Sequence, residues 1–136
     1  MVREKLLHVL CFGNPFVKGD DAAQKIAGKA REGRLKGMKF VSCGSPEELF
    51  AYARKDFVIL DVVKGIKKPV VIKDLRELEE TKLVSLHDFD LAFFLKLVEK
   101  LGLKAGKLGV TIVGIPANAK IGDVKPILLK LRENLG

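Results

Sequence analysis

The sequence has no tryptophan, one tyrosine and two cysteines among its 136 residues. Cys11 and Cys43 are far apart and lack Cys-x-x-Cys spacing, which argues against a metal knuckle or a redox pair. We expect both to be buried thiols. No apolar run approaches the roughly 18 residues that would suggest a membrane-spanning helix, and no secretory signal is recognisable. The sequence therefore predicts a soluble cytoplasmic protein.

Acidic residues are outnumbered, with 17 Asp and Glu against 25 Lys and Arg, so the formal net charge is +8. Such a balance can attract nucleic acids or acidic partners. The lysines, however, form no dense stripe, and they are not interleaved with aromatic residues in a pattern suited to base stacking. We therefore expect a solvated basic surface and do not expect nucleic-acid binding to be the main role. The oligomeric state stays open.

Apolar runs alternate with helix-like segments along the chain. Because this alternation is typical of parallel sheets covered by helices, it predicts an α/β fold. We expect one domain over residues 1–136, a three-layer α/β/α sandwich with a mostly parallel five-stranded sheet. Strands are predicted at 5–12, 38–43, 57–63, 69–72 and 109–115, with a further strand-like run at 83–86, and helices at 21–32, from Ser45 onward, at 88–101 and at 123–134.

One strand is expected to be antiparallel. Only a few residues link Val63 to Pro69, whereas a parallel crossover connection needs about a dozen residues or more. The segment that begins at Pro69 should therefore run against its neighbours.

Polar residues stand out where predicted strands end. Asp20 and Asp21 follow the first strand, Asp61 lies near the end of the third, and His87 follows another strand-like run. The carboxyl ends of parallel strands lie on one side of a sheet, which is where α/β proteins place their ligands. Two carboxylates and an imidazole suit a divalent transition metal, so Asp21, Asp61 and His87 are the candidate site.

Each of these residues also has a purely structural interpretation. Asp21 is well placed to cap a helix, and a single histidine such as His87 is usually a surface residue. Asp61 is harder to explain structurally, because an acid inside an apolar strand costs several kcal/mol unless it is solvated, paired or metal-bound. His8 lies among leucines in the first strand, and we expect it to form a hydrogen bond in the core without a functional role.

Several common chemistries lack their motifs. Gly13-Asn14-Pro15 followed by Gly19 is neither a dinucleotide-binding nor a Walker loop, and Gly-x-Ser-x-Gly and His-Glu-x-x-His are absent. Nucleotide-binding and serine-hydrolase functions are therefore not indicated.

Five segments, taken in order, resemble the hydrogenase maturation proteases, endopeptidases that remove a carboxyl-terminal extension from the large subunit of nickel–iron hydrogenases. The resemblance spans most of the chain and lies in both loops and strands. The matching segments are Phe12-Gly13-Asn14-Pro15 with Asp20-Asp21, Cys43-Gly44-Ser45-Pro46-Glu47-Glu48, Val58–Val63, Ser85-Leu86-His87 and Val110–Pro116.

This resemblance implies a nickel-recognising endopeptidase. Asp21, Asp61 and His87 would be its metal-contacting and catalytic residues. The nickel would belong to the hydrogenase large-subunit precursor, which would be cut only after the metal has been inserted. The free protein would then hold no ion or another divalent ion, and no separate cofactor is implied.

Two alternatives remain at the level of the sequence. A non-cleaving protein of hydrogenase assembly would keep the same pocket and leave the precursor intact. A receiver domain of a phosphorelay also places acids after its first and third strands. In a receiver, however, the acidic pair directly ends the first strand, whereas here seven residues separate Gly13 from Asp21.

Overall fold

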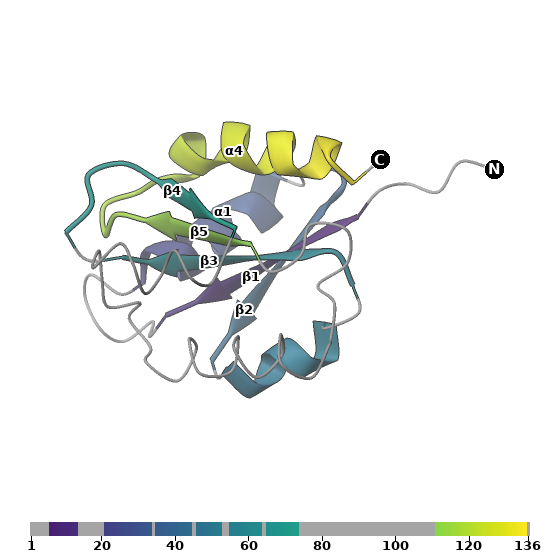
Figure 1. Ribbon diagram of the computed structural model, residues 1–136. Coiled ribbons are helices and arrows are strands. Elements are labelled where there is room, and N and C mark those ends of the chain that lie inside the picture. The colour runs from purple at the N-terminus through teal and green to yellow at the C-terminus, as the bar shows by residue number, and fades with distance from the viewer. Residues whose placement is uncertain are drawn as a thin grey trace.

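The computed structural model describes residues 6–13, 21–33, 35–44, 46–52, 55–63, 65–73 and 111–135. Within these ranges the chain forms one five-stranded sheet and three helical segments (Figure 1). In chain order they are β1 (Leu7–Phe12), α1 (Ala22–Gly33), β2 (Met38–Cys43), the 3₁₀ helix η1 (Pro46–Tyr52), β3 (Phe57–Val62), β4 (Val70–Ile72), β5 (Ile112–Ile115) and α4 (Ile121–Glu133).

The strand order in the sheet is β2-β1-β3-β5-β4. Four strands are parallel, and β4 pairs antiparallel with β5. The expectation of a mostly parallel five-stranded sheet is confirmed, as is the antiparallel direction of the strand after Pro69. The predicted strand-like run at 83–86 and the predicted helix at 88–101 lie outside the described residues.

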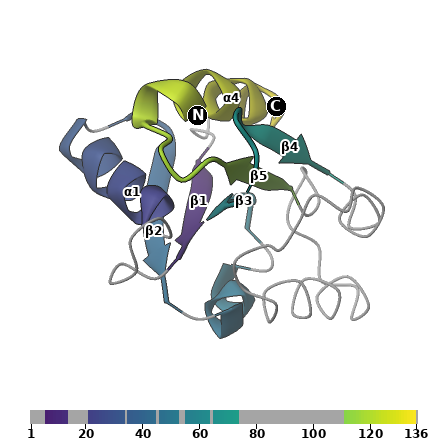
Figure 2. The same ribbon diagram turned by 90° about the vertical axis from the view of Figure 1, so that its left-hand side faces the viewer.

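Helices cover both faces of the sheet. Figures 1 and 2 show α1 and α4 on one face and η1 on the other. The face under α1 and α4 carries the larger core, to which alternate residues of β1 and β3 such as Val9 and Leu60 contribute. The intervening residues, among them Leu10 and Ile59, pack towards η1. Both faces of β1 and β3 are therefore buried, as their continuous apolar sequences predict.

The long helices lie where the apolar spacing places them. Helix α1 contacts the sheet through small residues and Ile26, which allows a close approach. Helix α4 begins two residues before the predicted start, because the Lys120 N–H donates to the Asp123 carboxylate at 2.9 Å and closes the first turn. It buries Val124, Leu128 and Leu131 at helical spacing.

A helix follows Ser45 and begins at Pro46, as predicted; it is the 3₁₀ helix η1. Its side chains that pack on the sheet are Leu49 and Tyr52, three residues apart. A 3₁₀ helix has three residues per turn and brings this pair onto one side. The Glu48 carboxylate accepts the Gly44 N–H at 2.6 Å and closes the entry to the turn.

Among the described residues, no helix combines the length and the apolarity that crossing a membrane requires.

Candidate active site

Asp61 lies in β3, one residue before the strand ends, and its side chain is completely buried. Burial of a carboxylate costs several kcal/mol unless hydrogen bonds or charges compensate. One compensating bond is the Val62 N–H, which donates to Asp61 Oδ1 at 2.9 Å. The buried acid predicted at the end of the third strand is therefore in place.

The direction of that bond places the carboxylate on the β1 side of β3. Main-chain groups alternate between the two sides of a strand. The Ile59 and Val63 N–H groups donate to carbonyls of β5 or its flanking residue at 2.9 Å, so the Val62 N–H points the other way, towards β1. The β1–β3 register ends at Cys11 and Leu60. The Asp61 carboxylate thus accepts a donor at the point where β1 stops pairing.

Asp21 directly precedes α1. Its carbonyl oxygen accepts the Lys25 N–H at 2.9 Å, the first bond of the helix. Its carboxylate lies 3.2 Å from the Lys25 Nζ, and the Asp21 side chain keeps 20% of its surface exposed. Asp21 therefore does begin the helix, as its structural interpretation requires. It also presents a carboxylate to solvent at the amino end of α1, where the helix dipole favours negative charge.

Gln24 fixes this end of α1 to the sheet. Its side-chain amide donates to the carbonyl oxygens of Cys11 and Gly13, each at 3.2 Å. Both carbonyls lie at the carboxyl end of β1. Asp21 is one helical turn from Gln24, so it is held at the same end of the strands as Asp61. The sequence analysis missed Gln24. The only signal for it in the sequence is that Gln24 is a polar residue between the buried Ala23 and Ile26.

The turn after β1 depends on glycine. Gly13 has φ of 147°, a conformation that other residues rarely adopt. Its carbonyl oxygen accepts the hydrogen bond from the Gln24 side-chain amide. The Gly-Asn loop noted in the sequence therefore has a backbone reason at Gly13. Asn14 and Asp20 lie outside the described residues.

The two carboxylates reach the strand ends from opposite faces of the sheet. Asp21 belongs to α1, which packs on the face lined by Leu60 and Val62. Asp61 alternates with these residues and shares the side of Ile59 and Val63, which face η1. The structure thus places Asp21 and Asp61 at the carboxyl ends of the strands, on opposite faces of the sheet next to the end of β1.

His87 lies outside the described residues, so its convergence with the two acids stays a prediction. Within the ranges that the structure describes, no group of three His, Cys, Asp or Glu side chains forms a metal site.

The other candidate nucleophiles and bases have structural roles. Cys11 and Cys43 are free, buried thiols, as expected. Burial raises the pKa of Cys11 strongly and that of Cys43 to about 12, so both stay protonated at neutral pH. His8 is 8% exposed, and its Nδ1 lies 3.3 Å from the carbonyl oxygen of Asp56, at the opposite end of β3 from Asp61. Burial lowers the pKa of His8, which favours the neutral ring.

Solved structures of hydrogenase maturation endopeptidases share this fold. The chain superposes on HycI from Escherichia coli with a TM-score of 0.67 and 19% identity, covering 96% of this chain and 92% of that one. HybD from Thermococcus kodakarensis gives a TM-score of 0.60 and 22% identity, with coverage of 94% and 95%. HybD from E. coli gives 0.59 and 18%, with coverage of 96% and 89%.

No protein-family model matches the chain, and no curated protein matches it in sequence. The likeness to these structures therefore establishes the fold. It is the fold of the family that the sequence motifs resemble.

Proposed function

We propose that this protein is an endopeptidase that removes the carboxyl-terminal extension of a nickel–iron hydrogenase large-subunit precursor after nickel has been inserted. The observation that carries the proposal is the completely buried Asp61 carboxylate at the carboxyl end of β3, in a fold shared with solved maturation endopeptidases. Core packing alone offers no reason for an acid there.

In this proposal Asp21, Asp61 and His87 contact the nickel that the precursor carries. Carboxylate oxygens and an imidazole nitrogen are suitable ligands for such an ion. Three protein ligands without a complete coordination shell hold a metal weakly, so the free protein should bind little nickel. The precursor supplies the remaining ligands, and productive binding then depends on prior nickel insertion.

The described contacts indicate how each acid would be held for this task. The Val62 N–H keeps the Asp61 carboxylate oriented towards the end of β1. Gln24 holds the first turn of α1, and with it Asp21, against the same strand end. Geometry of this kind matters because small displacements of a contacting group reduce catalysis strongly.

The sheet is also informative about the receiver alternative. A receiver domain has the flavodoxin-like strand order 2-1-3-4-5. In the described sheet the order is β2-β1-β3-β5-β4, and the edge strand β4 is antiparallel to β5. The observed topology therefore favours the maturation-protease proposal.

The test compares cleavage of nickel-loaded and nickel-free precursor at equal concentration, with release of the carboxyl-terminal peptide followed by mass spectrometry. We expect the parent to cut only the loaded form. The Asp61→Asn variant keeps the size of the side chain and loses its charge, so it should cut at least about a hundredfold more slowly, the scale of loss when one contacting catalytic group is removed.

Asp56→Asn is the matched control, because Asp56 precedes the same strand at its other end. It should cleave at the parental rate. Equal cutting of both precursor forms would refute metal gating, and binding without cutting of either form would favour the non-cleaving assembly protein.

A further inference from the structure

Among the described residues, the edge strands β2 and β4 differ in whether a side chain covers their outer main-chain groups. At the β2 edge, the Leu7 N–H donates to the Gly37 carbonyl, so alternation turns the Phe40 carbonyl away from β1. Arg31 of α1 covers this edge: its Nε donates to the Phe40 carbonyl at 3.3 Å, and its guanidinium donates to Ser42 Oγ at 2.9 Å. An edge capped in this way is protected from pairing with another chain.

The β4 edge has no such cover among the described residues. The Thr111 and Ile115 carbonyls accept the Ile59 and Val63 N–H groups. The main-chain groups of Thr111 and Ile115 therefore face β3. Those of Ile112 and Gly114 then face β4, where they pair with Ile72 and Val70. Main-chain groups of the intervening residue, Val71, therefore point away from the sheet.

Side-chain exposure agrees with this geometry. Val71 is 37% exposed, and its pairing with Val113 places it on the face of the sheet that carries α4. In both ribbon views α4 lies beside β4 (Figures 1 and 2). Within the described part of the chain, β4 thus has an apolar side chain next to main-chain groups that point away from β5.

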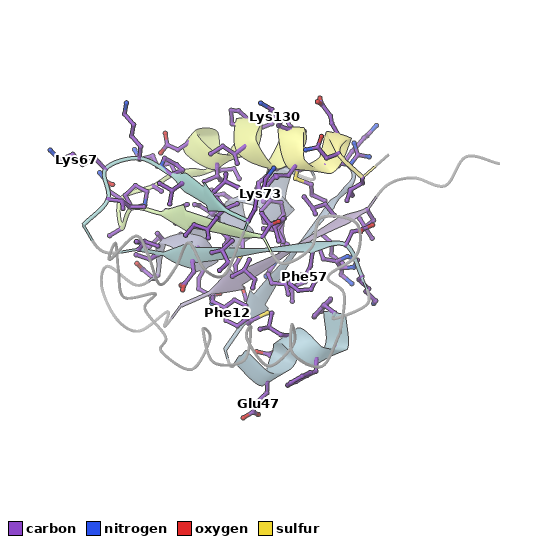
Figure 3. The ribbon with its side chains drawn as sticks, viewed as in Figure 1. Phe12, Glu47, Phe57, Lys67, Lys73 and Lys130 are labelled. Carbon is purple, nitrogen blue, oxygen red and sulfur yellow. The ribbon has the colours of Figure 1, made fainter. Side chains whose placement is uncertain are left out.

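Lysines flank β4 within residues 65–73. Residues 65–73 include the exposed Lys67, Lys68 and Lys73 and no acidic residue. Figure 3 shows Lys67, Lys73 and Lys130 in the half of the molecule that holds β4 and α4, whereas Glu47 projects from η1 at the opposite end. A partner of complementary charge would be acidic.

We propose that β4 is a docking edge for an extended, acidic segment of the precursor, which adds to the sheet by main-chain hydrogen bonds to Val71 and charge contacts with Lys67, Lys68 and Lys73. Strand addition of this kind is a common mode of peptide recognition. A second copy of this chain fits less well, because pairing of two β4 edges would bring six lysines together. The proposal rests on the function proposed above and names where its substrate docks.

The register relates this edge to the candidate site. Asp61 pairs with Gly114, and Gly114 pairs with Val70, so the three residues lie at one level across the sheet. A segment added outside β4 would run three strand spacings from Asp61, or about 14 Å. An extended chain covers this distance in roughly four residues. The docked segment should therefore lie about four or more residues from the peptide bond that is cut.

The experiment uses the intact protein and a fluorescein-labelled peptide of ten alternating glutamates and valines, with binding followed by anisotropy. We expect saturable binding and, by NMR, slower hydrogen exchange at the Val71 amide. A peptide N-methylated at the residue that faces Val71 cannot donate to the Val71 carbonyl, so full N-methylation at alternate residues should weaken binding about fivefold, the scale of one net hydrogen bond. Lys73→Glu should weaken binding about threefold or more.

Lys39→Glu is the matched control, since Lys39 is exposed on the β2 edge of the same sheet. It should bind the peptide as the parent does. Equal weakening by both substitutions, or equal affinity for the N-methylated peptide, would overturn the docking edge. Tighter, Lys73-dependent binding of an oligothymidylate would assign the surface to nucleic acid, and β4-dependent dimers in sedimentation would assign it to a second copy; either result also overturns the proposal.

This assay is independent of cleavage. Asp61→Asn should bind the acidic peptide with parental affinity, because Asp61 is two strands away from β4. Peptide binding without precursor cleavage by the parent would therefore locate the failure in the proposed function, and cleavage without peptide binding would locate it in the docking edge.

Discussion

Replacement of Gln24 by methionine tests whether the contacts of one side chain hold α1 at the strand ends. Methionine has nearly the same length and helix propensity as glutamine, so the helix itself should be little affected. It cannot donate to the Cys11 and Gly13 carbonyls, which Gln24 contacts at 3.2 Å each. The variant therefore removes the two hydrogen bonds between α1 and the end of β1 and leaves the helix propensity of α1 nearly unchanged.

The expected cost follows from the surroundings of the two acceptors. A net hydrogen bond contributes about 0.5–1.5 kcal/mol, with larger losses where an acceptor is left buried. Cys11 is fully buried and Gly13 only half-buried, so we assign about 1.5 kcal/mol to the first bond and about 0.5 kcal/mol to the second. The free energy of unfolding should fall by about 2 kcal/mol, which for a domain of this size lowers Tm by roughly 8 °C.

Urea and thermal unfolding followed by circular dichroism would measure this change. Lys25→Met is the matched control, because it introduces the same side chain at the next position and breaks only the exposed 3.2 Å ion pair with Asp21. Such surface pairs contribute at most about 1 kcal/mol. If Gln24→Met cost no more stability than Lys25→Met, the assigned attachment of α1 would be wrong.

Three further predictions concern the sheet and its core. Cys11 and Cys43 should react with a thiol reagent at neutral pH only after unfolding in urea, because burial raises the pKa of both thiols, that of Cys43 to about 12; rapid labelling of the native protein would contradict this. Burial also lowers the pKa of His8 from 6.5, so the unfolded state takes up the proton first; the stability that neutral His8 contributes should be complete above pH 6.5 and lost as the pH falls below it, a slope that His8→Gln should lack in urea titrations. Gly114→Ala should cost about 1–3 kcal/mol in the same measurement, since its Cβ would lie 2.7 Å from the Val63 Cγ2, and the loss should shrink when Val63→Ala makes room.

Periodicity and connection length were sufficient to predict most of the described fold. The continuous apolar runs of β1 and β3 indicate strands buried on both faces, and the short link before Pro69 requires the antiparallel β4. The type of helix after Ser45 could not be predicted, because a capping pattern is common to α and 3₁₀ helices and the choice depends on how Leu49 and Tyr52 pack.

The location of the candidate site could be predicted from the sequence, but the hydrogen bonds that hold its residues in place could not. Strand ends and polar residues alone indicate Asp21 and Asp61, because parallel strands bring their carboxyl ends together. The contacts of Gln24 are with main-chain carbonyls more than ten residues away, and no side-chain pattern records such partners. His87 stays a prediction because it lies outside the described residues.

The faces from which the two acids arrive constrain where a shared ion could bind. Along β3, Asp61 alternates with Leu60 and Val62, so its side chain begins on the η1 side, whereas Asp21 comes from α1 on the other side. The intact sheet separates these two faces as far as the end of β1. If both carboxylates contact the nickel of one precursor, the ion must therefore lie beyond that end, next to the Gly13 turn. Gly13, with its φ of 147°, directly follows β1, and the buried donor at Val62 orients the Asp61 carboxylate towards the same strand end.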